Sequence, residues 1–466
     1  MGPLDAGAIA QALGPHVASV VGFVMAIVLV ARSAQQRRPT GSTLAWVLAI
    51  VLIPYVGVPL YLVLGGRKLR QRSAAKPKLY AKPPDLAGER GTIVRMLCST
   101  GAPAPTRQNR VELLATGELA YAAVARAIES ATRSIHVSTL IFAGDDVGLA
   151  ICALLEAKAR AGVEVCVLVD ALFRFRSSRA QMTRLREAGA RVAWFMPLWS
   201  LPFRTNANLR LHRKAVVVDG KVAIVGGMNL AQEYMGPVPL PGRWRDLSAE
   251  MTGPVVDDVE ALFAADWEFA APGERLAQRP REASHEPAGD AEIQTVGSGP
   301  DVPTDPIYDA FLCSIFGATA RLWIATPYFV PDEALTRAIV LAVRRGVDVR
   351  ILVPKRSNHL TADLAGASYL REIERAGGKV HCFEGAMMHA KIVLVDDTLG
   401  ALGSANMDMR SFFLDYEVAF FFTSRAEVLG LSEWFLSVLP QCSALAPASR
   451  ARALAESMAR LIAPLE

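Results

Sequence analysis

The feature of this sequence that most constrains its fold is a motif that occurs twice. Residues 212–219 are HRKAVVVD and residues 389–396 are HAKIVLVD, so both fit H-x-K-x-x-x-x-D at an offset of 177 residues. Around them the chain repeats itself further, with RAGVEVCVLVD at 160–170 and RRGVDVRILVP at 344–354. An offset this long indicates a duplicated domain, because solenoid repeats recur every 20–50 residues or so.

Within each half, short apolar runs alternate with helical segments. In the first half, residues 134–142 and 163–170 have the length and composition of buried strands, and the helical pattern between them ends at a glycine. Strands that alternate with helices predict an α/β sheet covered on both faces. We therefore expect two duplicated α/β halves, 105–271 and 301–466, joined by a polar, Pro- and Gly-rich linker at 272–300.

The first 85 residues differ in composition from the rest. Two apolar runs, at about 9–31 and 44–64, predict a membrane helical hairpin, and the second is long enough to cross about 30 Å of hydrocarbon. Three arginines lie between the runs, whereas seven basic residues follow the second, which predicts that the large domain is cytoplasmic. This basic strip is expected to contact anionic headgroups, with a simple anchor as the alternative. The strip consists of Arg67, Lys68, Arg70, Arg72, Lys76, Lys78 and Lys82.

Composition narrows the choice of partners and cofactors. The net charge is only +5 and the longest basic run follows an apolar one, which argues against a nucleic-acid partner. The six cysteines form no C-x-x-C pair, so we expect free thiols and no disulfide framework or zinc site. Residues 450–466 form an amphipathic pattern, which predicts a helix that caps its own domain or, alternatively, lies on a membrane.

The repeated motif brings together groups that suit phosphate chemistry. On an extended chain, the His and Lys of each motif are two residues apart and face the same side. A Gly-rich G-x-x-N turn after each motif adds an asparagine. The resulting set is His212, Lys214, Asn229, His389, Lys391 and Asn406.

This set predicts transfer of a phosphodiester. The lysines would hold the non-bridging oxygens, and the asparagines would donate further hydrogen bonds to them. One histidine would attack phosphorus to form a phosphohistidine, while the other protonates the leaving oxygen and then deprotonates the incoming alcohol. We expect no metal or other cofactor, because a lysine beside each histidine repels a cation and no second cluster of ligands is present.

At this point the chain resembles the bacterial cardiolipin synthases of the phospholipase D superfamily, over nearly its full length. The stretches that carry the resemblance are NLRLHRKAVVVDG, ATPYFVPD, FEGAMMHAKIVLVDD and GSANMDMRSFFLDYE. The resemblance implies two phospholipase D-like halves with one active site at their interface. It also implies that two phosphatidylglycerol molecules condense to cardiolipin and glycerol without a metal. The expected location is the bacterial inner membrane, with the lipid bilayer and its phospholipids as partners.

The resemblance also implies carboxylates that orient the histidines. Asp246, in WRD at 244–246, is expected to orient His212, and Glu417, in DYE at 415–417, to orient His389. Such a carboxylate fixes the tautomer and supports the imidazolium. Asp415 is the rival of Glu417 for this role.

The two aspartates of the motif need a separate interpretation. Asp219 and Asp396 are counted with the catalytic motif, but each comes seven residues after its histidine, about 23 Å along a strand. We expect them to hold the turn and not to touch phosphate. The family pattern has G-S-x-N in both halves, whereas the first half here has Gly227 in place of serine, which would remove one hydrogen bond.

Two further residues are candidates for substrate binding. Tyr328, after the first strand of the second half, could contact an acyl chain or glycerol, or could pack in the core. Arg410 could bind a second phosphate, or could be an ordinary surface arginine.

Other functions remain open at this stage. A phospholipase D-type hydrolase would use the same residues, with water in place of the lipid alcohol. A nuclease of the superfamily would need exposed basic and aromatic surfaces. A non-catalytic membrane scaffold is the alternative outside the enzymes, and two intact motifs argue against it.

Overall fold

The structure, a computed structural model, describes most of the region after residue 90 and little before it. The described residues are 40–53, 55, 57–58, 76, 78–80, 91–196, 199–200, 204–205, 209–276 and 287–462. The first predicted apolar run and much of the second lie outside these residues, and the second begins within helix α2 (Thr40–Leu52). None of the helices in the described part is both long and apolar enough to span a membrane.

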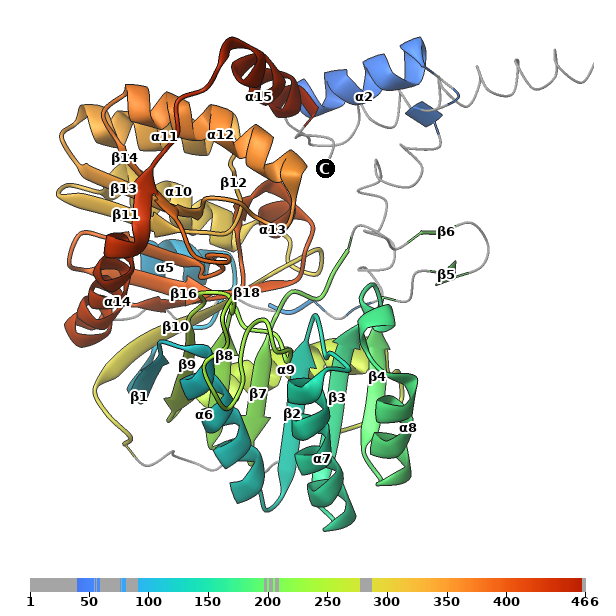
Figure 1. Cartoon of the computed structure of the whole chain (residues 1–466). Helices are drawn as coiled ribbons and strands as arrows, with labels where there is room; N and C mark the ends of the chain where they lie inside the picture. The colour runs from blue at the N-terminus through green and yellow to red at the C-terminus, as the bar shows by residue number, and fades with distance from the viewer. Residues whose placement is uncertain are drawn as a thin grey trace, which may run out of the picture.

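A fifteen-stranded sheet runs through both halves of the molecule (Figure 1). The first half contributes β1 (Thr106–Leu114), β2 (Ser134–Thr139), β3 (Glu164–Asp170), β4 (Arg191–Phe195), β7 (Ala215–Val218), β8 (Val222–Gly226) and β9 (Ser248–Thr252). The second contributes β10 (Ala291–Ser298), β11 (Arg321–Ala325), β13 (Asp348–Pro354), β14 (Lys379–Phe383), β15 (Ile392–Val395), β16 (Leu399–Gly403), β18 (Glu417–Phe422) and β19 (Cys442–Ala444). Two small ribbons pair β5 (Trp199–Ser200) with β6 (Arg204–Thr205) and β12 (Phe329–Val330) with β17 (Met407–Asp408).

The strand order confirms the duplication. Outward from the central antiparallel pair β1–β10, the first half runs β1-β9-β8-β7-β2-β3-β4 and the second runs β10-β18-β16-β15-β11-β13-β14-β19. Each half has three parallel strands, β2-β3-β4 or β11-β13-β14, and its remaining neighbours are antiparallel. The sheet is therefore mixed, with an approximate two-fold axis between β1 and β10.

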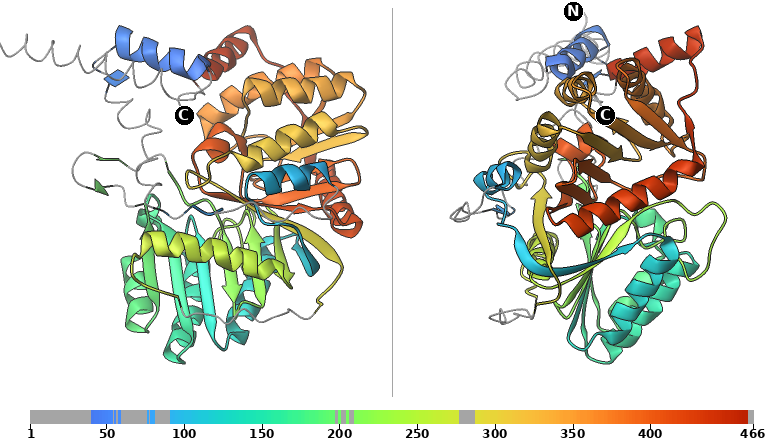
Figure 2. Two further views of the ribbon diagram at one scale, coloured as in Figure 1. Left: turned by 180° about the vertical axis from the view of Figure 1, so that it is seen from behind. Right: turned by 90° about the vertical axis from the view of Figure 1, so that its left-hand side faces the viewer.

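Helices cover both faces of each half, as the alternating pattern predicts (Figure 2). On one face of the first half lie α6 (Gly117–Ser130), α7 (Asp146–Arg160) and α8 (Arg179–Glu187), and on the other lies α9 (Val255–Ala270). In the second half, α10 (Pro306–Gly317), α11 (Glu333–Arg344) and α12 (Leu360–Arg375) face α14 (Arg425–Val438) across the sheet. The remaining helical segments are α5 (Thr92–Ser99), α13 (Met409–Phe413), α15 (Arg450–Ile462), η2 (Arg174–Arg176) and η3 (Leu439–Gln441).

The two halves share one hydrophobic core. Val217 of β7 and Leu394 of β15 are both buried in it, together with apolar residues of α9 and α14. The Trp434 indole N–H of α14 also donates to the Ala115 carbonyl of the first half, at 3.4 Å. Because burial of apolar surface is the main source of folding free energy, this shared core holds the halves in a fixed relation.

The predicted linker at 272–300 requires a correction, because its last part is strand β10. This strand lies between β1 and β18, near the middle of the sheet. Its composition conceals it, since Gln294 and Thr295 are buried polar residues. The Gln294 amide is satisfied by the Pro103 carbonyl, at 2.8 Å, so a polar side chain is stable in this position.

The C-terminal helix packs on its own domain, as one of the two predicted alternatives requires. Helix α15 lies against α12, where Arg371 donates to Glu456 at 2.7 Å and Arg460 donates to Glu372 at 2.9 Å. Its Leu454 remains exposed.

One residue of the predicted basic strip is inside the fold. The Lys76 side chain is 0% exposed and forms ion pairs with Asp266 and Asp301, whereas Lys78 is exposed. The expectation that Lys76 contacts lipid headgroups is therefore wrong.

Candidate active site

The histidine and lysine of each motif were predicted to lie on a strand. They lie instead in the segment just before it. Strand β7 begins at Ala215, one residue after Lys214, and β15 begins at Ile392, one residue after Lys391. Both segments are at the interface between the halves, where they form backbone contacts with the opposite half.

These backbone contacts follow the same pattern twice. The His212 N–H donates to the Tyr416 carbonyl of the second half at 3.0 Å. The His389 N–H donates to the Arg245 carbonyl of the first half at 2.7 Å. Each motif is therefore held by the half to which it does not belong.

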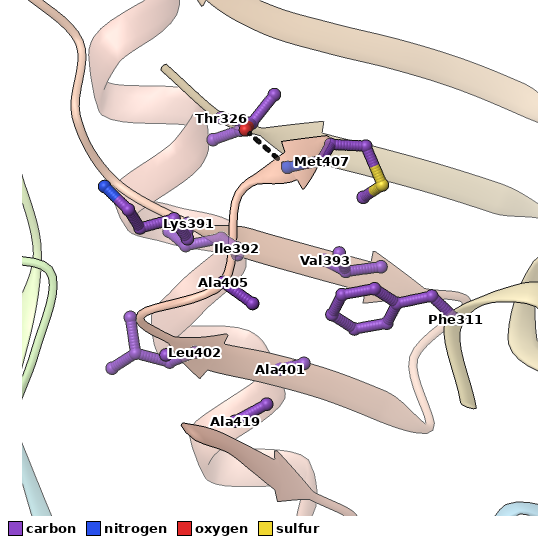
Figure 3. Close-up of a pocket in the computed structure, with 12 residues that line it drawn as sticks. Phe311, Thr326, Lys391, Ile392, Val393, Ala401, Leu402, Ala405, Met407 and Ala419 are labelled. Atoms are coloured by element: carbon purple, nitrogen blue, oxygen red, sulfur yellow. Dashed lines mark hydrogen bonds between the residues drawn. The ribbon is translucent and has the colours of Figure 1, made fainter. Parts of the chain in front are cut away.

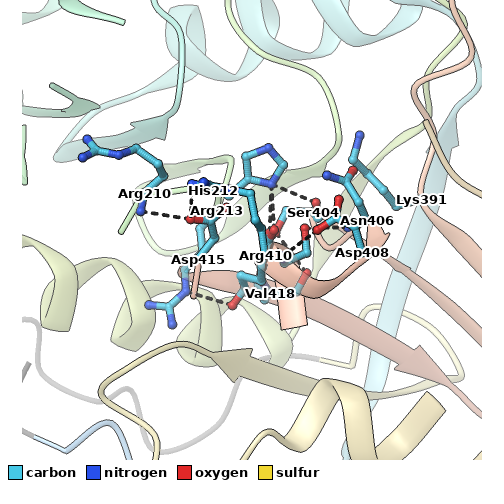
Figure 4. Close-up of polar contacts among 12 residues, drawn as sticks. Arg210, His212, Arg213, Lys391, Ser404, Asn406, Asp408, Arg410, Asp415 and Val418 are labelled. Atoms are coloured by element: carbon cyan, nitrogen blue, oxygen red, sulfur yellow. Dashed lines mark hydrogen bonds and ion pairs between the residues drawn. The ribbon is translucent and has the colours of Figure 1, made fainter. Parts of the chain in front are cut away.

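The first half-site pairs His212 with a buried glutamate. The His212 Nδ1 is 3.0 Å from Glu417 Oε2. It is also 3.0 Å from the Ser404 carbonyl oxygen (Figure 4). Both neighbours are acceptors, so Nδ1 carries the proton and Nε2 is left with the lone pair. The Ser404 hydroxyl also donates to Glu417 and accepts from the Val418 N–H at 3.0 Å.

The second half-site pairs His389 with Asp246. The distance from His389 Nδ1 to Asp246 Oδ2 is 2.7 Å. Tyr234 and Trp244 pack against the imidazole with ring centroids 5.2 and 5.3 Å away. The Lys391 ammonium is 2.9 Å from Nδ1 and 3.1 Å from Nε2 of the same ring.

The carboxylate partners are therefore the reverse of those expected. Asp246 does not orient His212, and Glu417 does not orient His389. The β-ladders explain why, because Gly226 pairs with Ser248 and Gly403 pairs with Ala419, which makes Asp246 and Glu417 equivalent positions of the duplication. The two-fold axis brings each carboxylate to the histidine of the opposite half.

Among the described residues, Asp415, the rival carboxylate, forms no hydrogen bond or ion pair with either histidine ring. It accepts from the Arg210 N–H at 3.1 Å and is 3.5 Å from the Arg410 guanidinium (Figure 4). Burial raises the pKa of Asp415 to about 7.

The two orienting carboxylates differ in charge state. Burial acts to raise the pKa of Glu417, but His212, Lys214 and the Ser404 hydroxyl outweigh it and hold the pKa below its ordinary value. Burial raises the pKa of Asp246 to about 7, despite the opposing effect of Lys391. Glu417 is therefore ionised at neutral pH, whereas Asp246 is close to half protonated.

The lysines are also perturbed by burial. Burial lowers the pKa of Lys214 to about 8 and that of Lys391 to about 7. Burial also lowers the pKa of both His212 and His389, so both imidazoles are neutral at pH 7. A phosphodiester anion would restore positive charge on the lysines, because an opposite charge favours the protonated form.

Each asparagine offers one amide atom that lacks a hydrogen bond of normal geometry. The Asn229 Oδ1 accepts from the Thr139 hydroxyl at 3.3 Å and the Ile141 N–H at 3.2 Å, which leaves its buried Nδ2 without a partner. The Asn406 Oδ1 is likewise buried without a partner. An unpaired buried amide atom is costly. The Asn229 Nδ2 is a donor suited to a phosphate oxygen, whereas the Asn406 Oδ1 is an acceptor suited to a substrate hydroxyl.

Comparison with known proteins decides the family. The model "Cardiolipin synthase, PLD-like domain" matches residues 124–267 and 311–439, and "Phospholipase D-nuclease N-terminal" matches residues 21–66. Cardiolipin synthase A of Pseudomonas aeruginosa is 37% identical over 423 residues, which are 86% of this chain and 84% of that protein. The cardiolipin synthase of Geobacillus kaustophilus is 33% identical over 459 residues, 93% of this chain and 90% of that protein. The chain belongs to the cardiolipin synthase family.

A solved structure supports the fold of this cardiolipin synthase family member. Phosphatidylserine synthase of Haemophilus influenzae Rd KW20 matches with a TM-score of 0.62 and 16% identity, over 80% of this chain and 98% of that one. At this identity the match shows the phospholipase D-like fold alone.

The departure from the family's G-S-x-N pattern has a steric cause. A Cβ at Gly227 would lie 2.4 Å from Asp246 Oδ1, so the Asp246 carboxylate occupies the space of a serine side chain. Asp246 instead accepts from the Leu247 N–H at 2.7 Å. The missing serine therefore changes the half-site more than the loss of one hydrogen bond would.

The motif aspartates lie at the far ends of their strands. Asp219 accepts from the N–H groups of Thr132, Arg133 and Ser134, at 2.7–2.9 Å. Asp396 makes the same bonds to Thr319, Ala320 and Arg321, at 2.7–3.2 Å. These contacts match the predicted role in the turn.

Apolar side chains fill the space beneath each lysine. A small pocket under Lys391 is lined by Phe311, Ile392, Ala405 and Met407 (Figure 3). An equivalent pocket under Lys214 is lined by Val124, Met228 and Met235, among others. Because each lysine stem borders apolar side chains, its ammonium is held toward the interface.

The two substrate-binding candidates both belong to the second half, Tyr328 in a loop and Arg410 in the short helix α13. The Tyr328 hydroxyl bonds Asn358, and its ring packs edge-on against His359 at 5.3 Å. Arg410 is the second residue of α13, and its guanidinium is 3.5 Å from Asp415 (Figure 4). Sequence reasoning missed Tyr234, which packs on His389, because a single aromatic residue in a loop carries no distinguishing pattern.

Proposed function

We propose that this protein is a phosphatidyltransferase that makes cardiolipin from two phosphatidylglycerol molecules and releases glycerol. The observation that carries the proposal is the pair of buried His–carboxylate contacts, one from each half, at a single interface. Family membership supports the substrate class. Apart from the family, the site supports transfer between phosphodiesters in general.

In this proposal His212 is the nucleophile. Its Nδ1–H is bonded to the ionised Glu417, so its Nε2 lone pair can attack phosphorus, and Glu417 stabilises the positive charge that develops on the ring. The bond from phosphorus to the glycerol oxygen breaks, and the proton for that oxygen comes from His389, whose protonated form the bound phosphodiester anion favours. The product is a phosphatidyl group on His212 and free glycerol.

The second step reverses the first with a lipid alcohol. His389, now neutral, takes the proton from a hydroxyl of the second phosphatidylglycerol headgroup, whose oxygen attacks phosphorus as the P–N bond to His212 breaks. Lys214, Lys391, Asn229 and Asn406 would hold the non-bridging oxygens throughout. No redox cofactor or metal enters this balance.

Further parts of the proposal concern the setting of the reaction. Tyr328 and Arg410 are proposed to contact the second lipid, with Arg410 near its phosphate. The protein is proposed to be bound to the bacterial inner membrane through residues 1–85, with the large domain on the cytoplasmic side. The match of residues 21–66 to the N-terminal family model supports this placement.

The test is turnover of labelled phosphatidylglycerol by the full-length protein in detergent with a chelator present. Cardiolipin and glycerol in equal amounts are expected. Phosphatidic acid as the sole lipid product would replace the proposal with a hydrolase. No product from phosphatidylglycerol, with folded protein, would reject this substrate.

A further inference from the structure

Lys76 forms part of a buried charge cluster between the two halves. Its ammonium pairs with Asp266 of α9 and lies 2.8 Å from Asp301 Oδ2, and all three side chains are 0–1% exposed. Arg213 completes the cluster, with its Nη1 at 2.8 and 2.9 Å from the two oxygens of Asp266. Two positive and two negative charges therefore balance in the interior.

The cluster lies directly behind the first half-site. Arg213 is the residue between His212 and Lys214, and its guanidinium donates to the Glu417 carbonyl at 3.0 Å and to the Ser298 carbonyl at 3.0 Å. The same side chain thus joins the backbone of the glutamate that orients His212 to the charge cluster.

An aromatic ring links the cluster to the same backbone. The Lys76 ammonium is 4.5 Å from the centroid of the Tyr416 ring, and the Arg213 guanidinium is 5.6 Å from it. The Tyr416 carbonyl accepts from the His212 N–H, and the Tyr416 N–H donates to the Arg210 carbonyl. Cations next to this ring therefore restrain the segment that holds His212.

The charges of the cluster depend on one another. Burial acts to raise the pKa of Asp266, but Arg213 and Lys76 outweigh it and hold the pKa below its ordinary value. The Asp301 carboxylate accepts no hydrogen bond of normal geometry among the described residues, so the Lys76 ammonium is its close counter-ion. Without Lys76, a buried carboxylate would compete with Asp266 for Arg213.

We propose that Lys76 is a positioning residue for the His212–Glu417 pair, acting through Asp266, Arg213 and Tyr416. The segment that joins the proposed membrane region to the catalytic halves would then help to build the active site as well as connect it. The expected effect on cardiolipin turnover rests on the proposed function, whereas the contacts within the charge cluster are independent of it.

The test compares Lys76→Met with Lys78→Met in the full-length protein in detergent. Lys78 is exposed and two residues away on the same segment, so it is a matched control. With phosphatidylglycerol, Lys76→Met is expected to lower kcat about 100-fold with little change in KM, because a small displacement of a reacting group costs about that much. Lys78→Met is expected to keep the wild-type kcat, with any effect of its predicted headgroup contact confined to KM.

A second substrate separates this proposal from the proposed function. Phosphatidyl-p-nitrophenol has a leaving group that needs no acid, so its burst of p-nitrophenol reports attack by the nucleophile alone. Lys76→Met should slow the burst by a similar factor even if the wild type makes no cardiolipin. A purely structural role for Lys76 would lower the melting temperature and leave the burst rate of the folded fraction unchanged.

A double variant carries the test if Lys76→Met does not fold. In Lys76→Met/Asp301→Asn the unpaired carboxylate is gone, so the protein should fold, and its burst should remain about tenfold slower than that of the wild type. A wild-type burst rate in either folded variant would overturn the proposal. So would an equal loss in Lys78→Met.

Discussion

The two half-sites are equivalent in fold and unequal in chemistry. In one, His212 faces an ionised glutamate that also receives the Ser404 hydroxyl. In the other, His389 faces Asp246, whose pKa burial raises to about 7 and whose carboxylate takes the space above Gly227. A duplicated fold can thus provide one histidine with a carboxylate that stays ionised and the other with a carboxylate that gains or loses a proton near pH 7.

This difference fits the opposite roles proposed for the histidines. A nucleophile benefits from a carboxylate that stays charged, because positive charge develops on its ring. An acid that later becomes a base benefits from a site whose proton affinity is close to the working pH. The predictions that follow test this inequality.

The largest expected effect is loss of a histidine. His212→Ala and His389→Ala should each lower cardiolipin synthesis by about 10⁴-fold or more, since each removes a reacting group. With phosphatidyl-p-nitrophenol the two should differ. His389→Ala should give a burst of p-nitrophenol and a phosphatidyl adduct on His212 by mass spectrometry, and His212→Ala should give neither. A burst from His212→Ala would reverse the assignment of the nucleophile.

Substitution of the two orienting carboxylates should also have unequal effects on kcat, with the larger loss on the His212 side. Glu417→Gln should lower kcat by about 10⁴-fold, because it removes an ionised partner and favours the wrong tautomer. Asp246→Asn should cost only about 100-fold, since Asp246 is already partly protonated at pH 7. The pH–rate profile checks the reason, because Asp246→Asn should remove the Asp246 ionisation near pH 7 and keep that of Lys391, whereas Glu417→Gln should retain both. Equal losses with unchanged profiles would contradict the inequality.

Exchange of the small residues should sharpen the comparison. Gly227→Ser should lower kcat by about 100-fold, because the new Cβ would displace the Asp246 carboxylate. Ser404→Gly creates no clash and removes one hydrogen bond to a charged group, about 1.5–3 kcal/mol, so a loss of roughly 10- to 100-fold is expected. Steady-state kinetics in parallel would measure both. A fully active Gly227→Ser variant would show that Asp246 can move without cost.

The smallest effect on catalysis is expected from substitution of the two motif aspartates, whose contacts are nearly the same in both halves. Asp219→Ala and Asp396→Ala should each destabilise the fold by about 2 kcal/mol, because each leaves backbone N–H groups unpaired. The kcat of the folded protein should change by less than about threefold. Urea unfolding and kinetics on the same samples would separate these effects. A loss of kcat without a loss of stability would return both residues to the catalytic set.

The pH dependence of this stability has a definite sign. Burial acts to raise the pKa of Asp219 and Asp396, but backbone N–H groups outweigh it and hold each pKa below its ordinary value. Their contribution is therefore complete above the unfolded pKa of about 4 and is lost as the pH falls through the folded pKa. The difference between wild type and Asp219→Ala should be largest near pH 7 and should shrink below about pH 4.

The comparison also shows how far sequence reasoning extends. The duplication, the alternation of strands and helices and the six His, Lys and Asn residues were predicted, because each depends on local patterns that occur twice. Strand β10 was assigned to the linker, because Gln294 and Thr295 are polar but buried, and Gln294 finds its partner in Pro103, which no local pattern reveals. The pairing of carboxylates with histidines was predicted in reverse for a related reason. That pairing depends on an axis between the halves, and neither half encodes the position of the other.

By itself, the sequence determined the chemistry that is available, two histidines with two lysines and two amides in a repeated frame, since residue type and spacing are local properties of the chain. Only the tertiary structure decided which carboxylate contacts which histidine. It also decided that Asp246 lies against Gly227, at the position where the other half has Glu417 beside Ser404. It also decided that Lys76, a basic residue like its neighbours in the chain, is buried among Asp266 and Asp301. The physical reason is that burial and the close approach of charges depend on distances through space, and segments far apart in the chain set those distances.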